Sequence, residues 1–294
     1  MERKLVRPQS LHEALNCRAE YGEDGLPIAG GQSLLVMLRN KLIDPRVLID
    51  LEPVKELRGV APQSQQVSIG AMTTFFELIS SPALHSALPL VAAAASKVGS
   101  TAIRNLGTIG GNLCHNEPGA DLPPALLALG ASVELQSRGG TRTLLLTDFF
   151  RDFFQTAVEA DELLCRIEIP ALAAGARGVY LKHSISAEDL AIAGAAVLFI
   201  PDGKGGNGAG ELRIALSGVA PVPFRAAKAE AALKGSALND EAIRAAAELA
   251  ASEADPMNDP HASADYRRKM VKVLVRRGIA TALQQAERNG HGKA

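Results

Sequence analysis

Cysteine is scarce in this 294-residue chain, and tryptophan is absent. The three cysteines, Cys17, Cys114 and Cys165, lie far apart in the sequence. They can supply neither a framework of several disulfides nor a metal site with four thiolate ligands. Although Cys114 stands beside His115, a buried or loop thiol with an incidental neighbour is more common than a metal site. We therefore expect no metal ligand on this chain, and any iron–sulfur cluster must lie on another one.

The sequence also lacks long apolar runs and an excess of either charge. Its apolar stretches are interrupted before the roughly 18 residues that a membrane-spanning helix requires, and residues 1–8 contain no signal-peptide core. The formal net charge is only -1, which does not indicate nucleic-acid binding. We expect a cytoplasmic protein with no integral membrane segment.

One basic run near the C-terminus offers an alternative to that expectation. It consists of Arg267, Arg268, Lys269, Lys272, Arg276 and Arg277. Apolar residues between these positions follow a helical period, so the basic side chains are typical of the solvated face of a helix. This interpretation is preferred over nucleic-acid binding.

Hydrophobic residues make up 47% of the chain, enough for two or three packed lobes. Residues 26–29 and 47–51 resemble short buried strands around an amphipathic stretch at 33–42, which predicts a compact βαβ-like unit. A mixed α+β region follows, with further strands at 67–69, 131–135 and 163–169 and an alanine-rich helix at 84–97.

A lobe boundary is expected near residues 171–178, where the sequence is small and loop-like. Beyond it, strands at 192–200 and 211–219 flank a glycine-rich loop at 201–210. We interpret this loop as a hairpin turn, because its Gly-Lys pair lacks the spacing of a phosphate loop. Helices are predicted at 240–253, capped by Asn239, and at 263–287.

Two segments with paired glycines carry the functional information, IAGGQSLL at 28–35 and GTIGGNL at 107–113. Glycine lacks a Cβ and permits positive φ, so consecutive N–H groups can converge on an anion such as phosphate. In the first segment the glycines end a strand and Ser33 opens a helix, whose N-terminus adds partial positive charge. In the second, Thr108 and Asn112 can donate hydrogen bonds while Ile109 and Leu113 anchor the loop in the core.

The pairing of the two segments matters more than either one. A single Gly-Gly is more often an ordinary turn than a ligand site. The chain also lacks the Gly-x-Gly-x-x-Gly and Walker patterns, so neither a Rossmann nor a P-loop site is supported. Together the segments predict a diphosphate site in a different dinucleotide-binding fold.

At these residues the chain resembles the FAD-binding medium subunit of the molybdenum hydroxylases of the xanthine dehydrogenase and carbon monoxide dehydrogenase type. The resemblance covers nearly the whole chain, and its second motif is highly specific. Its motifs are AGGQSL at 29–34, IRNLGTIGGNL at 103–113, PGADLPP at 118–124, IEIP at 167–170 and YRR at 266–268.

The resemblance implies one non-covalent FAD whose diphosphate is clasped by both glycine segments. It also implies that Asp121 hydrogen-bonds the cofactor, that Leu164 packs against it, and that Lys182 lies near the isoalloxazine ring. By themselves these three residues would be an ordinary turn, core and surface residue. The expected cofactor-binding residues are Ile28, Ala29, Gly30, Gly31, Gln32, Ser33, Leu34, Leu35, Thr108, Ile109, Gly110, Gly111, Asn112, Asp121, Leu164 and Lys182.

The implied fold is α+β, with a two-part FAD-binding lobe of the PCMH type followed by a smaller C-terminal lobe. The first spans residues 1–175, with subparts of about 1–55 and 56–175. The second spans 178–288, is of the carbon monoxide dehydrogenase flavoprotein type, and combines an antiparallel sheet with helices. FAD is expected between the lobes.

The implied function is electron transfer within a complex of several subunits. Substrate is hydroxylated at a molybdopterin on a large subunit, and electrons cross two [2Fe-2S] clusters on a small subunit before reaching FAD on this chain. FAD then passes them to an external acceptor. Such subunits commonly assemble as a dimer of heterotrimers. No catalytic nucleophile, base or metal ligand is assigned, because no Ser-His-Asp set or HExxH motif is present.

The chain departs from the family pattern at 182–189 (KHSISAED), where many relatives carry two arginines. Ile185 and Ser186 stand in this stretch instead, and losing positive charge near the flavin is expected to lower its potential or to alter which oxidant gains access. No cysteine-bearing insertion like that of the 4-hydroxybenzoyl-CoA reductase branch is present.

Two other interpretations of the sequence stay open. One is a non-redox nucleotide-binding or scaffolding protein of the same fold, which carries ADP or no ligand. The other is a self-sufficient flavin oxidase. The substrate of the complex and its terminal acceptor are also open.

Overall fold

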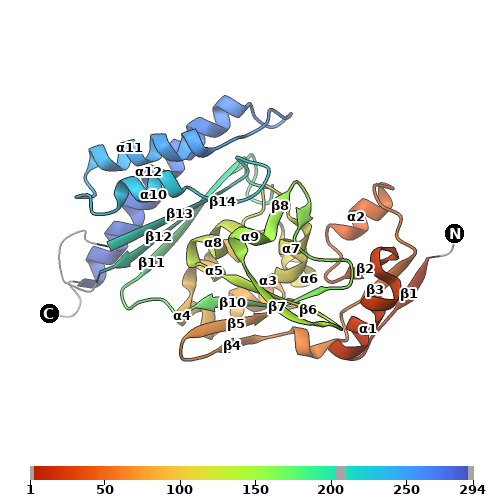
Figure 1. The fold of residues 1–294 in the computed structure, drawn as a ribbon. Coiled ribbons are helices and arrows are strands. Elements are labelled where there is room, and N and C mark those ends of the chain that lie inside the picture. Colours follow the sequence, from red (N-terminus) through yellow and green to blue (C-terminus); the bar gives the residue numbers. More distant parts are fainter. Residues whose placement is uncertain (1–2, 203–209, 291–294) are drawn as a thin grey trace.

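Four β-sheets organise the chain in the computed structural model, which describes residues 3–202 and 210–290 (Figure 1). Helices and sheets alternate through a first, a middle and a C-terminal lobe, which confirms the predicted α+β class. Among the helices of the described residues, none is long and apolar enough to cross a membrane.

The first lobe is a three-stranded parallel sheet of order β1-β3-β2. Its strands β2 and β3 pair in parallel around α2, which confirms the βαβ unit predicted from the apolar pattern. The elements are β1 (Lys4–Val6), α1 (Leu11–Tyr21), η1 (Gly22–Asp24), β2 (Gly25–Ile28), α2 (Leu34–Arg39) and β3 (Val47–Asp50).

The middle lobe is built on a five-stranded antiparallel sheet of order β4-β5-β10-β6-β7, joined by the β8-β9 hairpin. Its strands are β4 (Val60–Pro62), β5 (Gln66–Gly70), β6 (Ser132–Ser137), β7 (Gly140–Leu145), β8 (Phe150–Asp152), β9 (Gln155–Thr156) and β10 (Leu163–Pro170). Its helices are η2 (Lys55–Leu57), α3 (Phe75–Ser80), α4 (Pro82–Ala87), α5 (Pro89–Ala95), α6 (Thr101–Leu106), α7 (Ile109–His115), α8 (Leu122–Leu129) and α9 (Leu146–Phe149).

The C-terminal lobe is a four-stranded antiparallel sheet of order β11-β12-β13-β14 with helices on one face. Strands β12 and β13 form the expected hairpin, with Pro201 opposite Gly210; residues 203–209, on which the phosphate-loop alternative falls, lie outside the described part of the chain. The elements are β11 (Arg177–His183), β12 (Ala193–Pro201), β13 (Gly210–Ser217), β14 (Phe224–Arg225), α10 (Ala227–Leu233), α11 (Asp240–Glu253) and α12 (Ala264–Gly290).

Strand β12 joins the middle and C-terminal lobes because both of its faces are buried. Ala195, Val197 and Phe199 pack in the C-terminal core, whereas the alternate residues Ala196 and Leu198 belong to the core of the middle lobe. A period of two places successive side chains on opposite faces of a strand. The two lobes therefore share one strand as part of their packing.

One expectation about local structure was wrong, and one strand was not predicted. The helix predicted at 84–97 is broken into α4 and α5 at Leu88, which lies before Pro89 and has φ −141°. Proline lacks an N–H and disfavours helical geometry in the residue before it. Strand β11 was not foreseen, because its sequence has no clear alternation of apolar and polar residues. The predicted helix at 240–253 and its Asn239 cap are confirmed.

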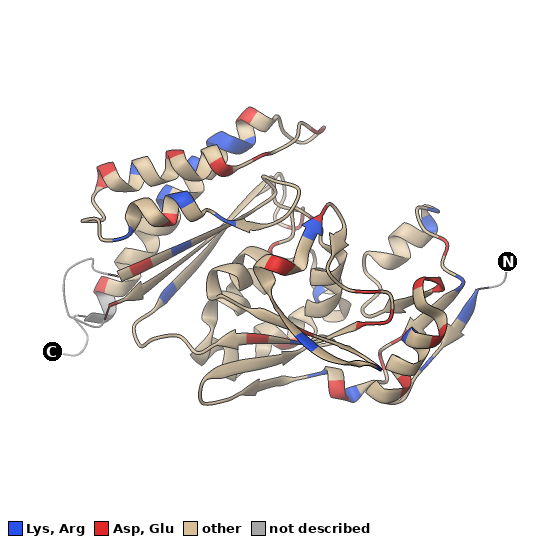
Figure 2. Cartoon of the chain, in the orientation of Figure 1, with Lys and Arg blue, Asp and Glu red and all other residues tan. Residues whose placement is uncertain are grey.

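The basic run lies in α12, as expected, although its members differ in their surroundings. Arg267 is buried, Arg268 pairs with Asp265 on the same helix, and Lys272 pairs with Glu248 of α11. Figure 2 shows basic (blue) and acidic (red) positions interspersed along these C-terminal helices.

Helix α8 is the element whose packing most directly supports both lobes, because it lies between α5 and strands β12 and β13. Leu126 in this helix is completely buried. We expect Leu126→Ala to lower the free energy of unfolding by about 2–5 kcal/mol through lost burial and a residual cavity. Leu145→Ala, at a 58% exposed position, serves as the control. Equal effects of both substitutions in chemical denaturation of the cofactor-free protein would contradict the prediction.

Candidate cofactor site

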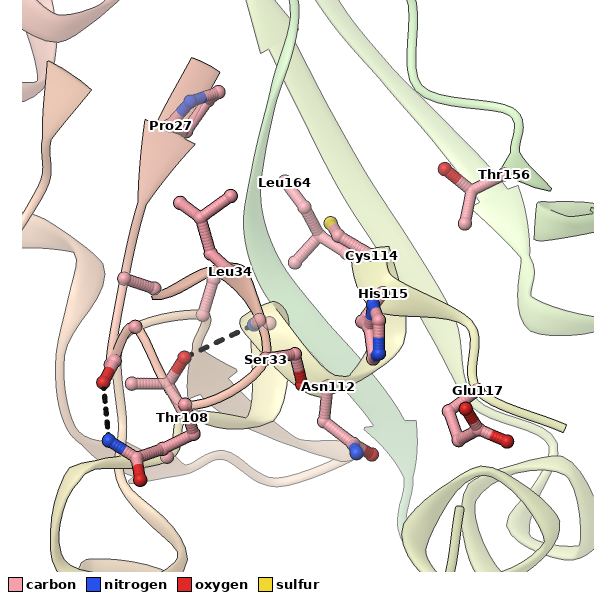
Figure 3. Close-up of a pocket in the computed structure, with 18 of the residues that line it drawn as sticks. Pro27, Ser33, Leu34, Thr108, Asn112, Cys114, His115, Glu117, Thr156 and Leu164 are labelled. Carbon is pink, nitrogen blue, oxygen red and sulfur yellow. Dashed lines mark hydrogen bonds between the residues drawn. The ribbon is translucent and has the colours of Figure 1, made fainter. Parts of the chain in front are cut away.

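A cavity of about 910 Å³ lies where the first lobe, the middle lobe and one segment of the C-terminal lobe meet. We call it the main cavity. It is at the large end of the roughly 300–1,000 Å³ typical of small-molecule sites. Its wall is formed by the loop after β2, the start of α7, the β8-β9 hairpin and residues 188–190. Figure 3 shows Ser33, Thr108 and Asn112 close together in this wall.

The two glycine segments lie against each other. A Cβ on Gly30 would stand 1.9 Å from the carbonyl oxygen of Leu106, and a Cβ on Gly111 would meet that of Ala29 at 3.5 Å. Only a residue without a side chain allows the first of these approaches. Segments almost 80 residues apart in the sequence thereby form one surface of the main cavity.

The first glycine segment presents unoccupied backbone donors. The N–H groups of residues 30–34 donate to no protein acceptor within the part of the chain that the structure describes. Gly31 has φ +69°, the left-handed conformation that glycine adopts at little cost. Ser33 precedes α2, but its hydroxyl makes no capping bond and is free to bind a ligand. Consecutive free amides of this kind suit the oxygens of a phosphate.

The second glycine segment works differently, and the expectation of free amides there was wrong. The N–H groups of Ile109 and Gly110 donate to the carbonyls of Thr73 and Ala71 at 3.0 and 2.8 Å. Those of Gly111 and Asn112 donate to the hydroxyl and carbonyl of Thr108 at 3.1 and 3.0 Å. These bonds fix the first turn of α7. A Cβ on Gly110 would lie 2.6 Å from that of Ala71, so this glycine serves internal packing.

What the second segment offers to a ligand is side chains. The Oδ1 atom of Asn112 is buried without a hydrogen-bond partner, although the residue lines the main cavity. A buried acceptor left unpaired costs about 1–3 kcal/mol, which a ligand donor at this position would relieve. Ile109 and Leu113 are completely buried beneath it, as predicted for anchors of the loop.

Asp121 and Lys182 form a buried ion pair at the base of the main cavity. Lys182 Nζ lies 2.9 Å from Asp121 Oδ2, and the Tyr180 hydroxyl donates to Oδ1 at 2.7 Å. Lys182 Nζ also donates to the carbonyl of Lys97 at 2.9 Å. Burial raises the pKa of Asp121 above its usual value, while the Lys182 ammonium opposes this shift. The pair joins the start of α8 to β11 of the C-terminal lobe.

Most of the predicted cofactor residues line the main cavity. They are Ala29, Gly30, Gly31, Gln32, Ser33, Leu34, Thr108, Gly110, Gly111, Asn112, Asp121 and Leu164. The other four do not: Ile28 and Ile109 lie behind the wall, Leu35 is exposed, and Lys182 is directed to Asp121. Ile185 lines a neighbouring cavity rather than this one.

One side of the main cavity was not predicted from the sequence. It is formed by the end of α7 and by the β8-β9 hairpin. His115, Glu117, Phe154 and Thr156 line this side of the main cavity. Phe154 has φ +54°, an unusual conformation for an aromatic residue, and its ring centroid lies 5.3 Å from that of His115. The only signal in the sequence was the adjacent pair Phe153-Phe154 in a chain poor in aromatic residues.

The ionisable groups in this missed wall are shifted by burial. Desolvation lowers the pKa of His115 and raises that of Glu117. Cys114 is accessible from the cavity yet surrounded by protein, and burial raises the pKa of its thiol to about 12. The thiolate is therefore not populated at neutral pH. No group of three or more potential metal ligands occurs among the described residues.

Comparison with known families agrees with this geometry. The family model for the FAD binding domain in molybdopterin dehydrogenase matches residues 1–172, and that for the CO dehydrogenase flavoprotein C-terminal domain matches residues 179–282. The chain belongs to this family of flavin subunits. Its first two lobes are thus an FAD-binding domain, and the predicted order of the domains is confirmed.

The relatives of this chain align with it over almost its whole length. It is 38% identical to the carbon monoxide dehydrogenase medium chain of Hydrogenophaga pseudoflava, over 94% of this chain and 95% of the relative. It is 36% identical to the glyceraldehyde dehydrogenase medium chain of Sulfolobus acidocaldarius, over 93% and 95%. These relatives are oxidoreductase subunits, which supports the predicted class of activity.

Solved structures give the same result. The carbon monoxide dehydrogenase from Hydrogenophaga pseudoflava that lacks the Mo-pyranopterin moiety matches with a TM-score of 0.93 at 37% identity, over 97% of this chain and 98% of that one. Quinoline 2-oxidoreductase from Pseudomonas putida 86 matches with a TM-score of 0.90 at 33% identity, over 97% and 98%.

The contact between the glycine segments can be tested by Gly30→Ala. The added methyl group would force the Leu106 carbonyl away and separate the two segments, at a cost of about 1–3 kcal/mol. We expect FAD affinity to fall by about tenfold or more. Gly139→Ala is the matched control, because its Cβ would meet no atom closer than 3.4 Å. The measurement is quenching of FAD fluorescence by the cofactor-free protein; similar dissociation constants for both variants would rule out the proposed role of Gly30.

The buried ion pair gives a second prediction. Asp121→Asn leaves the Lys182 ammonium buried without its counter-ion, which is expected to lower the free energy of unfolding by about 3–5 kcal/mol. The double variant Asp121→Asn, Lys182→Met should recover much of this loss, because no uncompensated charge remains. Asp24→Asn, in an exposed pair with Arg46, should cost at most about 1 kcal/mol. The free energies of unfolding are measured by chemical denaturation. A double variant no more stable than Asp121→Asn would contradict the prediction that the unpaired Lys182 charge causes the loss.

Proposed function

We propose that this chain binds one FAD non-covalently in the main cavity and passes electrons from [2Fe-2S] clusters of a partner subunit to an external acceptor. The observation that carries the proposal is the row of free amides at residues 30–34 in the lining of the main cavity, together with the buried, unpaired Oδ1 of Asn112 in the same lining. The free amides can donate to the oxygens of a diphosphate, and the Oδ1 of Asn112 can accept a hydrogen bond from a donor group elsewhere on the same ligand.

The two glycine segments have different tasks in this proposal. The amides and the Ser33 hydroxyl of the first segment hold the phosphate oxygens. Thr108 and Asn112 of the second segment bind the cofactor through side chains, and the internal hydrogen bonds of α7 keep them in place. Ile28, Leu35 and Ile109 support this surface from behind. Of the remaining predicted residues, Asp121 and Leu164 line the cavity and orient the rest of the cofactor, and Lys182 acts through its ion pair with Asp121.

FAD supplies the redox chemistry when it is bound, because it accepts electrons singly and releases them as a pair. The chain needs no nucleophile or general base for this. Its side chains bind and orient the cofactor, and the wall formed by Phe154 and Leu164 limits the access of water. Residues 188–190 of the lining are exposed to solvent, and we propose that an oxidant approaches the cofactor there.

The relatives named above are medium chains, and others are named as subunits of dehydrogenase complexes. On this basis we propose a large molybdopterin subunit and a small subunit with two [2Fe-2S] clusters as partners, in a cytoplasmic dimer of heterotrimers. We also propose domain boundaries at 1–175 and 178–288, with the first domain divided near residue 55.

The proposed cofactor can be tested by colour. The purified chain should be yellow, release one FAD per chain on denaturation, and bleach with dithionite. A colourless protein, or one that releases ADP, would instead support the non-redox nucleotide-binding alternative. Affinity purification from cells that express the chain natively should also recover a molybdenum subunit. Turnover of an organic substrate by the isolated chain would favour a self-sufficient oxidase.

A further inference from the structure

The segment of residues 184–192, between β11 and β12, separates two cavities. Glu188, Asp189 and Leu190 line the main cavity. Asp189 and Leu190 also line a second cavity of about 570 Å³, together with Ile185 and residues of the C-terminal lobe. The segment therefore forms part of the lining of both cavities, which also share Glu117 and Phe154.

The middle of the segment is weakly held. Residues 185–190 are exposed, and the side chains of Ile185 and Leu190 remain 69% and 56% accessible although they are apolar. Within the stretch, Ser186 N–H donates to Asp189 Oδ2 and Asp189 N–H donates to the carbonyl of Ser186; just beyond it, Ala191 N–H donates to the carbonyl of Gly119. A stretch with so few buried contacts is placed mainly by its ends.

Both ends are attached to the first turn of α12. At the start of the segment, His183 Nε2 lies 2.9 Å from the hydroxyl of Tyr266. At its end, Arg267 Nη1 donates to the carbonyl of Ile192 at 2.6 Å and to that of Gly218 at 2.8 Å. The two ends are also joined to each other, because the Ile192 N–H donates to the carbonyl of His183 at 2.8 Å. Tyr266 and Arg267 are adjacent in the sequence, so one helical turn binds both of these joined ends.

The burial of Arg267 is the most informative part of this arrangement. Its side chain is 8% exposed, is paired with Asp259, and lines the second cavity with its Nε buried and unpartnered. Burying a guanidinium is costly unless its fixed fork of donors is needed. Here the fork joins three parts of the chain, because it binds Ile192, Gly218 and Asp259 at once.

We propose that Tyr266 and Arg267 are positioning residues that fix the segment of residues 184–192. Through this segment they set how fast bound FAD leaves the main cavity and how readily an external oxidant reaches the reduced cofactor. The inference rests on the proposed function for its cofactor readouts. The attachment itself does not depend on bound FAD, and it can be measured separately.

The test compares Arg267→Met, Arg267→Lys and Tyr266→Phe with the control Arg268→Met. Arg268 follows directly on the same helix but is partly exposed, and its ion-pair partner among the described residues is the exposed Asp265. Each protein is followed by thermal unfolding and by amide hydrogen exchange of peptides covering residues 184–192 without FAD. The FAD-bound proteins then give the rate of FAD release and the reoxidation rates with ferricyanide and with a bulkier water-soluble quinone.

For Arg267→Met we expect exchange in residues 184–192 and the FAD release rate to rise by about tenfold over the control, because charge-assisted bonds to two carbonyls are lost. Arg267→Lys should restore part of this change. Tyr266→Phe removes one hydroxyl and should raise both rates about two- to fivefold. The ratio of the quinone rate to the ferricyanide rate should also rise, because a less firmly held segment obstructs the larger oxidant less.

The outcomes separate the two proposals. If the unmodified chain binds no FAD, the proposed function fails, and hydrogen exchange alone decides whether the attachment exists. If FAD binds but Tyr266→Phe and Arg267→Met match Arg268→Met in exchange, release and reoxidation, the positioning role is overturned. If Arg267→Met does not fold, Tyr266→Phe and Arg267→Lys are compared with Arg268→Met instead, and they test the positioning role in the same way.

Discussion

The approach of Gly30 to the carbonyl of Leu106 is the contact on which the cofactor site depends. It brings the first lobe onto the middle lobe at a distance that no side chain allows. The backbone at residues 30–34 turns there outside any β-ladder, so its amides stay unpaired in residues that line the main cavity. One steric requirement thus yields both the packing of two lobes and the donors of the site.

The opposite side of the site is organised by charge. The pair of Asp121 and Lys182 lies where α8 meets β11, and Tyr180 completes its hydrogen bonds. A buried ion pair tolerates little displacement, since separating the charges leaves each of them unsolvated. It therefore holds the C-terminal lobe in register with the middle lobe. The segment of residues 184–192 begins just after Lys182, so this ion pair helps to fix where it starts. Its end is fixed by the contact of Ile192 with Arg267 of α12.

The sequence predicted those features that depend on local pattern. The βαβ unit and the Asn239-capped helix follow from periods and caps over a few residues, and they are confirmed. The resemblance supplied the cofactor and the family. The pairing of the Ile109 and Gly110 amides was beyond local reasoning, because their acceptors, the carbonyls of Thr73 and Ala71, lie 36 and 39 residues earlier in the chain. The wall formed by Phe154 likewise arises only when the β8-β9 hairpin folds onto α7.

The charges around the main cavity explain why uncharged donors matter there. Its lining contains seven carboxylates and, among the described residues, one cation, Arg18. The guanidinium of Arg18 is bound to carbonyls of the chain itself, including those of Gly22 and Glu162, so it is not available to a ligand. A diphosphate in this cavity must be bound by amide dipoles held in fixed positions. Such dipoles need no counter-ion and cannot change protonation state, so their partial charges at the cavity are fixed by the fold.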